Sequence, residues 1–241
     1  PRPSRGTPRP NSRGFSGQIG GVGGVGGVGG EDGLEAQGFD PTTAPRPGRR
    51  RGARPRVGAM ATTRAVALLR GINVGGKNPV RMADLRAALE GAGYGDVRTY
   101  IQSGNVLFTT DEPAAGLEDR VEAVLEERFG IPIVVVIRTE RQFRAVVAKA
   151  PEGFGQQPDT YHSDAVFLKQ PLTAARAMEV VQLRDGVDRA WPGTGVVYFE
   201  RLSAQRTKSK LNAIMGTPEY QRMTIRSWST TTRLLALLDE G

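Results

Sequence analysis

Segments that suit β-strands alternate with segments of helical periodicity from Met60 onward, and this order constrains the fold more than any other feature of the chain. In the first half, apolar or β-branched runs typical of strands lie at Ala65–Leu69, Val97–Ile101, Val106–Thr110 and Ile133–Ile137. Apolar residues recur at helical spacing after Asn78-Pro79 and again from Leu117 to Phe129. The resulting order, β-α-β-β-α-β, is that of the ferredoxin-like split motif.

The second half of the chain partly repeats this order. Strands are expected at Ala165–Lys169, Val187–Trp191 and Val196–Phe199, and helices at Leu172–Val181, at Lys208–Met215 and after Thr217-Pro218. Thr139 and Gln142 form a capping box for a connecting helix, and Ser227 is expected to cap a final helix. We therefore predict an α+β protein with two ferredoxin-like subdomains, residues 60–138 and 139–241, and extra C-terminal helices.

The first 59 residues differ from the rest in composition. They contain 16 glycines, 8 prolines and ten arginines against four acidic residues, and so account for most of the formal charge of +8. With few large apolar residues to bury, they cannot offset the entropy lost on ordering, and we expect residues 1–59 to be disordered. They are either an Arg/Gly-rich arm for RNA or spurious translation upstream of Met60. We favour the second, because arginine without lysine suits a GC-rich leader.

The absence of cysteine from all 241 residues excludes disulfides, thiolate nucleophiles and cysteine-ligated zinc. No apolar run approaches the roughly 20 residues that cross a membrane, and no signal-peptide segment follows the N-terminal arginines. From Met60 onward the chain has 23 basic and 21 acidic residues, so its net charge alone does not indicate nucleic-acid binding. We expect a cytoplasmic protein with no membrane partner, metal or cofactor.

The expected strand Ala65–Leu69 leads directly into a glycine-rich polar loop, residues 70–78, with the sequence RGINVGGKN. Such a loop can turn several backbone N–H groups toward one point, and its two cations suit an anion. The loop resembles a P-loop, but Asn78 stands where a nucleoside triphosphatase needs Ser or Thr for magnesium. No later strand ends in the Asp that would anchor the metal. The loop is either an anion site or a solvated turn, and its candidate binding residues are Arg70, Asn73, Gly75, Gly76 and Lys77.

Two further polar clusters lie at expected strand or helix ends. Residues 102–105, Gln-Ser-Gly-Asn, join two strands, and strand-end loops often gather at one edge of a split β-α-β-β-α-β fold. Ser103 and Asn105 are expected to add hydroxyl and amide contacts there, although a plain hairpin turn accounts for the same residues. Basic residues ending at Lys210 open a short helix, where cations oppose the helix dipole unless an anion docks. Lys210 and Arg226 are candidates for the rim, and a solvated basic face is the alternative.

Other polar residues favour no chemistry. His162, the only histidine, is expected to be exposed in a polar loop and uninvolved, which disfavours a catalytic triad or a histidine-rich metal site. No base accompanies Ser103, so a nucleophilic serine is not expected. The solvated face of the helix from Leu117 to Phe129 is expected to consist of acidic residues, namely Glu118, Asp119, Glu122, Glu126 and Glu127.

Three motifs carry a resemblance to a bacterial family. They are LLRGINVGGK at residues 68–77, TYIQSGN at 99–105 and TIRSW at 224–228. Together they resemble the domain of unknown function 1697, from about Met60 to the C-terminus. The last motif departs from the family's usual Arg-Asn-Trp-Asn, because Ser227 and Ser229 replace both asparagines. The resemblance implies an α+β fold with ferredoxin-like subdomains and implies no reaction, since the family's activity is not established.

These observations favour a protein that binds a phosphate-bearing ligand, a nucleotide or a nucleic acid, where the three polar segments meet. Arg70 and Lys77 are expected to neutralise the phosphate. The expected hydrogen-bonding and rim residues are Asn73, Ser103, Asn105, Lys210 and Arg226. One alternative is an enzyme acting on such a ligand by nucleotidyl transfer or hydrolysis, although its candidate metal carboxylates are scattered along the sequence. The other is a structural or interaction module whose motifs only fix turns and packing.

Overall fold

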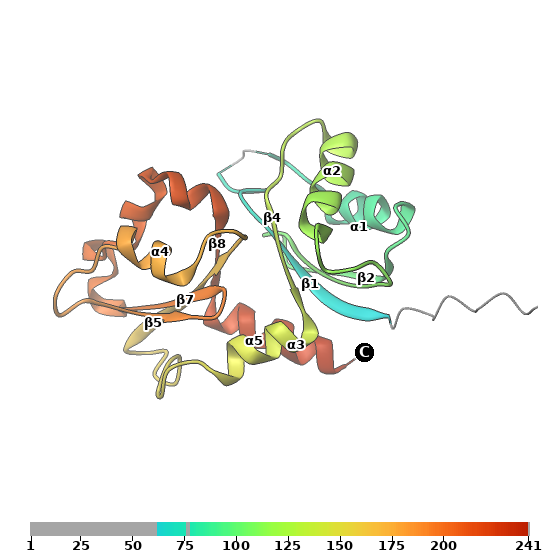
Figure 1. Cartoon of the computed structure of the whole chain (residues 1–241). Coiled ribbons are helices and arrows are strands. Elements are labelled where there is room, and N and C mark those ends of the chain that lie inside the picture. The colour runs from blue at the N-terminus through green and yellow to red at the C-terminus, as the bar shows by residue number, and fades with distance from the viewer. Residues whose placement is uncertain (1–61, 76–77, 241) are drawn as a thin grey trace, which may run out of the picture. The chain divides into compact units, whose positions relative to one another are not determined.

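The computed structural model describes residues 62–75 and 78–240, so the segment 1–59 that we expect to be disordered, and the loop residues Gly76 and Lys77, lie outside the described residues. The described residues belong to one compact unit. They form two four-stranded antiparallel sheets, each accompanied by helices (Figure 1). None of the described helices combines the length and apolar character that crossing a bilayer requires.

The first sheet comes entirely from the first half of the folded part. Its strands are β1 (Thr63–Leu69), β2 (Gly95–Tyr100), β3 (Asn105–Thr110) and β4 (Val135–Thr139). Their order is β2-β3-β1-β4, with α1 (Met82–Gly91) after β1 and α2 (Leu117–Phe129) after β3. This order confirms the expected ferredoxin-like fold of this half. The first helix begins at Met82 and not at Asn78, whose φ of 49° is left-handed.

The second sheet repeats the order of the first. Its strands are β5 (Tyr161–Leu168), β6 (Asp188–Gly193), β7 (Val196–Leu202) and β8 (Met223–Ser227), arranged β6-β7-β5-β8. The connection after β5 is α4 (Ala174–Val180), and the connection after β7 is a series of 3₁₀ turns, η1 (Ser203–Lys208), η2 (Leu211–Gly216) and η3 (Pro218–Arg222). The α-helices expected at Lys208–Met215 and after Thr217 are therefore wrong in type, and β8 was not expected at all.

A helix follows the last strand of each half, α3 (Glu140–Ala148) after β4 and α5 (Trp228–Asp239) after β8. Both expected caps are confirmed. Thr139 Oγ1 accepts from Gln142 N at 3.3 Å while Thr139 N donates to Gln142 Oε1 at 3.0 Å, which is a complete capping box. Ser227 Oγ accepts from the backbone N–H of Thr230 at 3.2 Å.

Each of these two helices is fastened to the sheet of the other half. Arg64 of β1 donates to the carbonyl of Leu238 in α5 at 2.7 Å, in keeping with the preference for cations at a helix C-terminus. Conversely, the Tyr198 hydroxyl of β7 donates to the carbonyl of Val146 in α3 at 2.7 Å. The helices α3 and α5 also contribute to a hydrophobic cluster that draws on both sheets. The two halves therefore share one part of their core.

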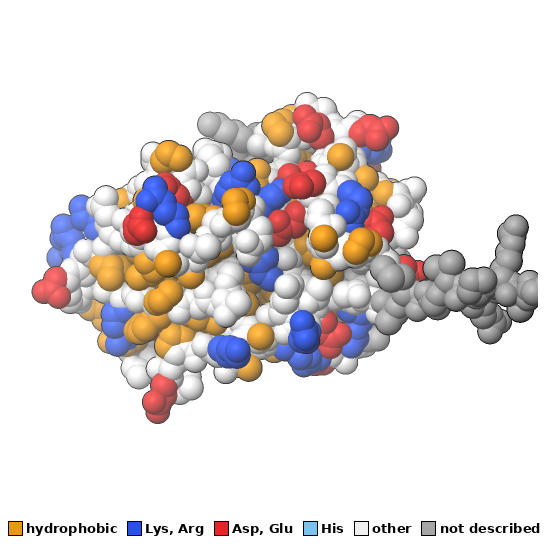
Figure 2. Space-filling view, in the orientation of Figure 1, with side chains coloured by type: hydrophobic (Ala, Val, Ile, Leu, Met, Phe, Trp, Pro, Cys, Tyr) orange, Lys and Arg blue, Asp and Glu red, His pale blue; other side chains and the backbone are white. Residues whose placement is uncertain are grey.

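The space-filling view shows how charge is distributed over the face drawn in Figure 2. Acidic and basic side chains are intermixed around α2, and hydrophobic side chains gather over the second sheet. The chain's large excess of basic residues is therefore absent from the neighbourhood of α2, as the nearly balanced composition after Met60 implies.

Two glycines near the start of β5 offer a matched stability test. Gly153 and Gly155 both have left-handed φ values, 75° and 71°. A Cβ on Gly153 meets nothing within 4 Å, whereas a Cβ on Gly155 lies 2.0 Å from Cδ1 of Trp228. The Trp228 ring cannot move freely, because it packs against Phe154 with centroids 5.0 Å apart.

We expect Gly153→Ala to lower the free energy of unfolding by about 1 kcal/mol, the cost of left-handed backbone alone. Gly155→Ala should add roughly 1–3 kcal/mol more, because Trp228 must be displaced. Urea denaturation of both variants measures the difference. Equal losses for the two variants contradict the packing of Trp228 on Gly155.

Candidate functional site

Arg226 of β8 brings the three sequence motifs together. Its Nη2 donates to the carbonyl of Leu69 at 2.7 Å. The same nitrogen reaches the carbonyls of Ser103 and Gly104 at 3.1 and 3.2 Å. Its Nε donates to Oδ1 of Asn105 at 2.5 Å. A side chain from the second half therefore ties together the end of β1 and the start of β3, and we call this region, with Arg70, the Arg226 corner.

The charge of Arg226 has no acidic partner. The side chain is buried, with 7% of the residue exposed, and burial lowers its pKa to about 10. At neutral pH it is still protonated. Its other donors go to Thr224 Oγ1 and the carbonyl of Ile225, so no carboxylate is among its partners in the described residues. Carbonyl and amide oxygens stabilise the guanidinium, but they leave one net positive charge beneath the two loops.

Asn105 and Gly104 support this arrangement. Asn105 is fully buried, and its Nδ2 donates to the carbonyl of Tyr100 at 3.0 Å and to Ser103 Oγ at 3.1 Å. Gly104 has φ of 79°, and a Cβ there would lie 2.8 Å from Cβ of Leu69. Glycine therefore allows the two loops to approach closely enough for Arg226 to bridge them. The amide of Asn105 faces protein groups and not solvent.

The glycine-rich loop is braced by its asparagines. Asn73 Nδ2 donates to the carbonyls of Val80 and Gln102 at 2.8 and 2.9 Å, and its Oδ1 accepts from the Val80 N–H at 2.8 Å. Asn78 Nδ2 donates to the carbonyl of Gly71 at 3.2 Å. These bonds fix where the loop begins and ends and leave Gly75, with φ of 58°, exposed. The two residues after Gly75 are outside the described part of the chain.

Arg70 lies at the accessible side of the Arg226 corner. Its guanidinium carbon is 4.6 Å from the centroid of the Tyr220 ring, and Nη1 donates to Gln221 Oε1 at 3.1 Å. Its Nε is buried without a hydrogen-bond partner in the described residues. No ion pair to Arg70 is formed within residues 62–75 and 78–240, so this cation too keeps its full charge.

Lys210 does not join the other candidate residues. Its backbone N–H donates to Oδ2 of Asp188 at 2.8 Å, which places it at the start of β6. Strands β6 and β8 are opposite edges of the second sheet, so Lys210 and Arg226 lie at different edges. Of the predicted site residues, the structure gathers Arg70, Asn73, Ser103, Asn105 and Arg226.

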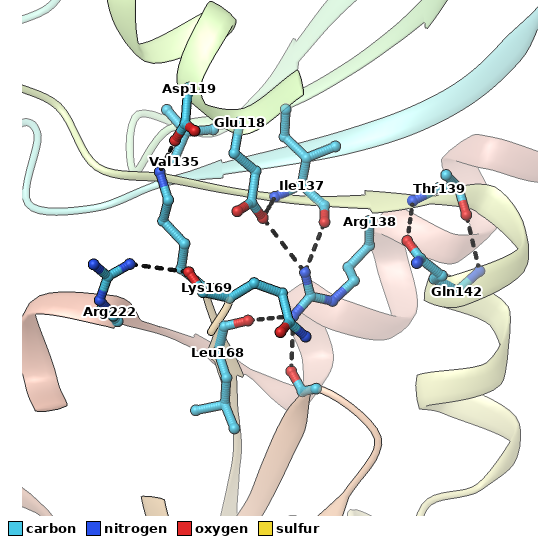
Figure 3. Close-up of polar contacts among 12 residues, drawn as sticks. Glu118, Asp119, Val135, Ile137, Arg138, Thr139, Gln142, Leu168, Lys169 and Arg222 are labelled. Atoms are coloured by element: carbon cyan, nitrogen blue, oxygen red, sulfur yellow. Dashed lines mark hydrogen bonds and ion pairs between the residues drawn. The ribbon is translucent and has the colours of Figure 1, made fainter. Parts of the chain in front are cut away.

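A second buried arginine repeats these contacts in the opposite direction. Arg138 of β4 donates through Nη2 to the carbonyls of Leu168 and Gly195, at 2.5 and 2.9 Å (Figure 3). Leu168 ends β5 as Leu69 ends β1, and Gly195 precedes β7 as Gly104 precedes β3. Each half thus inserts an arginine from its last strand into the strand ends of the other half. We call the second region the Arg138 corner.

The Arg138 corner differs because α2 supplies carboxylates to it. Lys169 follows β5 as Arg70 follows β1, and its Nζ donates to Glu122 Oε1 at 2.6 Å and to Asp119 Oδ1 at 3.0 Å. Burial alone would lower the pKa of Lys169, but these two hydrogen bonds raise it above the ordinary value. Arg138 Nη1 lies 3.6 Å from Oε1 of Glu118. Two cations here face three carboxylates.

Glu118 also pairs with the edge of the first sheet. Its Oε1 accepts from the backbone N–H of Ile137 at 2.8 Å, and Glu122 Oε1 accepts from that of Val135 at 2.7 Å. Because β4 is an edge strand, these glutamates satisfy N–H groups that no neighbouring strand reaches. Burial raises the pKa of Glu118, although the Ile137 N–H and Arg138 act in the opposite direction.

A cavity of about 450 Å³ opens at the Arg138 corner, and we call it the α2–α3 cavity. The first turn of α2 forms one wall with Leu117, Glu118 and Asp119, and one face of α3 forms another with Gln142, Val146 and Lys149. Further lining residues include Arg138, Lys169, Thr194, Gly195 and Tyr198. Its volume is in the range of small-molecule pockets.

The structure corrects two expectations about polar residues. Glu118 and Glu122 are not a purely solvated face, because they bind the β4 backbone and the cations of the Arg138 corner. His162 lies in β5 and not in a loop, and its Nε2 is 3.3 Å from Oδ1 of the buried Asp164. Within the described ranges, no group of three or more His, Asp or Glu side chains could hold a metal ion.

Arg138 and Lys169 were not predicted, yet the sequence holds a signal for the first. Ile137-Arg138-Thr139 and Ile225-Arg226-Ser227 are matching triplets, and each is followed by a helix that its last residue caps. The triplet therefore marks the same place in both halves: a buried arginine at the end of an edge strand. Lys169 carries no comparable signal.

Comparison with known proteins agrees with this architecture. Residues 62–198 match the family described as Protein of unknown function (DUF1697). The chain belongs to this family. A solved structure, that of the conserved bacterial protein SP0830 from Streptococcus pneumoniae, is 27% identical to this DUF1697 member, with a TM-score of 0.64 over 74% of this chain and 99% of that one. No curated protein matches. The Thr224–Trp228 motif lies beyond the residues that match the family.

The two buried arginines of this DUF1697 member should matter far more for stability than an exposed one. We expect Arg226→Ala to lower the free energy of unfolding by about 3–5 kcal/mol, because several buried oxygens lose their donor. Arg138→Ala should also cost about 3–5 kcal/mol, because the buried carbonyls of Leu168 and Gly195 lose their donor and Glu118 loses its nearby cation. Arg233→Ala on α5, which removes only an exposed pair with Glu240, should change stability by less than about 0.5 kcal/mol. Denaturant titration of the three variants measures these free energies of unfolding. A decrease for Arg226→Ala as small as that for Arg233→Ala refutes the bridging role of Arg226.

Proposed function

We propose that this protein binds a phosphate-bearing ligand at the Arg226 corner. The observation that carries the proposal is the excess of positive charge there: Arg226 and Arg70 have no carboxylate partner in the described residues, whereas their equivalents Arg138 and Lys169 face three. The two corners can be compared directly, because their arginines contact equivalent strand ends in the two halves. An anion is the ligand class that uncompensated cations favour.

The roles of the candidate residues follow from how their donors are used. Arg70 is the side chain with unused donors, and Lys77, next to Gly76 in the sequence, is the second cation expected to contact phosphate. Exposed Gly75 leaves the backbone open to close approach by a ligand. The polar groups of Asn73, Asn105 and Arg226 form hydrogen bonds within the protein. We assign them to holding the loops in place, with Arg226 also contributing charge.

The Tyr220 ring beneath Arg70 favours a nucleotide over a bare phosphate. Its contact with the guanidinium shows an aromatic side chain at the same corner, and aromatic faces stack on nucleobases. Lys210 is left out of the proposal, because it lies at the other edge of the second sheet. That separation makes it a useful control.

The structural alternative also has support. The fully buried amide of Asn105 and the six hydrogen bonds of Arg226 are what a joint between two halves requires, with or without a ligand. The two functions differ in what they need from Arg70 and Lys77. A joint does not need either cation to be accessible.

Binding of adenosine, guanosine, cytidine and uridine monophosphates, of inorganic phosphate and of a short single-stranded RNA to the full chain tests the proposal by calorimetry. Arg70→Ala and Lys77→Ala should each weaken nucleotide binding by about 10- to 100-fold, the range for one charge-assisted hydrogen bond. Lys210→Ala should leave it unchanged. If RNA is the ligand, its affinity should fall steeply with salt.

Two outcomes overturn the proposal in favour of the structural role. One is the absence of binding to every member of the panel. The other is binding that Arg70→Ala and Lys77→Ala leave intact while both variants unfold like the unmodified protein.

A further inference from the structure

The two loops of the Arg226 corner expose apolar side chains beside their cations. Val74 directly follows Asn73 in one loop, and Ile101 directly precedes Gln102 in the other. Because Asn73 Nδ2 donates to the carbonyl of Gln102 at 2.9 Å, Val74 and Ile101 are both next to the hydrogen bond that joins the loops. They are 62% and 48% exposed. The large apolar side chains that the described part of the chain exposes are these two, Leu183 and Met215.

Ile101 also has an unfavourable backbone conformation. Its φ is 50°, in the left-handed region. The other non-glycine residues described with a left-handed φ are Asn73, Asn78 and Asp96, and these residue types tolerate it because their short polar side chains form local hydrogen bonds. A β-branched residue is a genuine outlier there. Neither backbone preference nor full burial accounts for an isoleucine at this position, and strained residues of this kind cluster at ligand sites.

The amides that could read the edge of a nucleobase are already occupied. Asn73 uses both hydrogens of Nδ2 on the carbonyls of Val80 and Gln102, and its Oδ1 accepts from the Val80 N–H. Asn105 uses its Nδ2 on Tyr100 and Ser103, and its Oδ1 on Arg226. The corner therefore combines an accessible cation, Arg70, with apolar surface, and these two amides add no free polar partner.

We infer that the ligand of the Arg226 corner carries an aromatic body that lies against Val74 and Ile101, and that these two residues select it by apolar contact. This inference rests on the proposed function, in which Arg70 contacts the phosphate. It adds that the bases of nucleotides are bound through their apolar faces and are not distinguished by their hydrogen-bonding edges. Apolar walls with a few polar groups are the common form of a small-molecule site.

Calorimetry on the full chain with four phosphate monoesters tests the inference: adenosine and guanosine monophosphates, 2-naphthyl phosphate and ribose 5-phosphate. The two nucleotides should bind within about 3-fold of each other. 2-Naphthyl phosphate, which has no base edge, should bind about as tightly as they do. Ribose 5-phosphate should bind about 10-fold more weakly, because it has no apolar body to remove from water.

Two variants should remove this preference. Ile101→Asn and Val74→Asn should each weaken binding of 2-naphthyl phosphate by about 3- to 10-fold, the effect of losing part of the apolar contact. Both should leave ribose 5-phosphate binding unchanged. Leu183→Asn is the matched control, since Leu183 is 47% exposed and lies outside both loops, and it should change neither affinity.

Asparagine is chosen for Ile101 because it tolerates a left-handed φ, so the urea midpoint of Ile101→Asn should stay close to that of the unmodified protein. If Ile101→Asn fails to fold by circular dichroism, Val74→Asn carries the test alone.

The inference and the proposed function fail in different ways. Ribose 5-phosphate binding that equals that of 2-naphthyl phosphate, and that Arg70→Ala weakens, overturns the inference and leaves the proposed function standing. The inference is also overturned by a preference of more than about 10-fold between the two nucleotides, or by affinities that neither loop variant changes. Absence of binding by every phosphate monoester overturns both.

Discussion

A guanidinium group buried among carbonyl oxygens is the interaction on which the arrangement of the two halves depends. Arg226 donates to the carbonyl of Leu69 at the end of β1, and Arg138 donates to the equivalent carbonyl of Leu168 at the end of β5. Neither half can satisfy all of these donors by itself, because each Nη2 group belongs to one half and the carbonyls that it reaches belong to the other. Burying a charge is costly unless its hydrogen bonds are complete, so the exchange specifies one mutual position of the sheets. The shared hydrophobic cluster around α3 and α5 also stabilises the contact between the sheets, but the hydrophobic effect is non-directional and does not by itself fix their orientation.

Much of this fold could be predicted from the sequence. Apolar or β-branched runs in the sequence indicate strands β1 to β7. Their order with the helices, β-α-β-β-α-β, then predicts the observed sheet topology. The strand β8 could not be found in this way, because Thr224 and Arg226 are buried polar residues and break the apolar pattern. Its identity depends on partners from the other half, which a scan of local periodicity does not include. The sequence likewise predicts α-helices where the 3₁₀ turns η2 and η3 lie, the second because Thr217-Pro218 is a typical helix start.

The structure brings five of the predicted site residues together, while their binding of a ligand stays a prediction. The meeting of residues 70–73 with 103–105 follows from the gathering of strand ends, whereas Arg226 joins them from β8, a strand that the sequence did not predict. The sequence does not tell whether the Asn105 amide contacts a ligand or contacts Arg226, because an amide can do either. Only its complete burial in the structure distinguishes the two roles. The α2–α3 cavity escaped prediction for a different reason. Its lining comes from the first turn of α2, from β4, α3 and β7 and from the segment after β5, and the one motif among them, the Thr139–Gln142 capping box, indicates a helix start and not a pocket.

The charge difference between the two corners traces to one topological difference. In the first half, the connection from β3 to β4 is the α-helix α2, which presents Glu118, Asp119 and Glu122 to the Arg138 corner. In the second half, the equivalent connection from β7 to β8 ends in η3, which presents Tyr220 and Gln221 to Arg70. Both halves thus place a buried arginine at the strand ends of the other half, but the residues around the two arginines differ. Because the buried arginines and strand ends are equivalent, the difference in charge between the corners originates in these two connections.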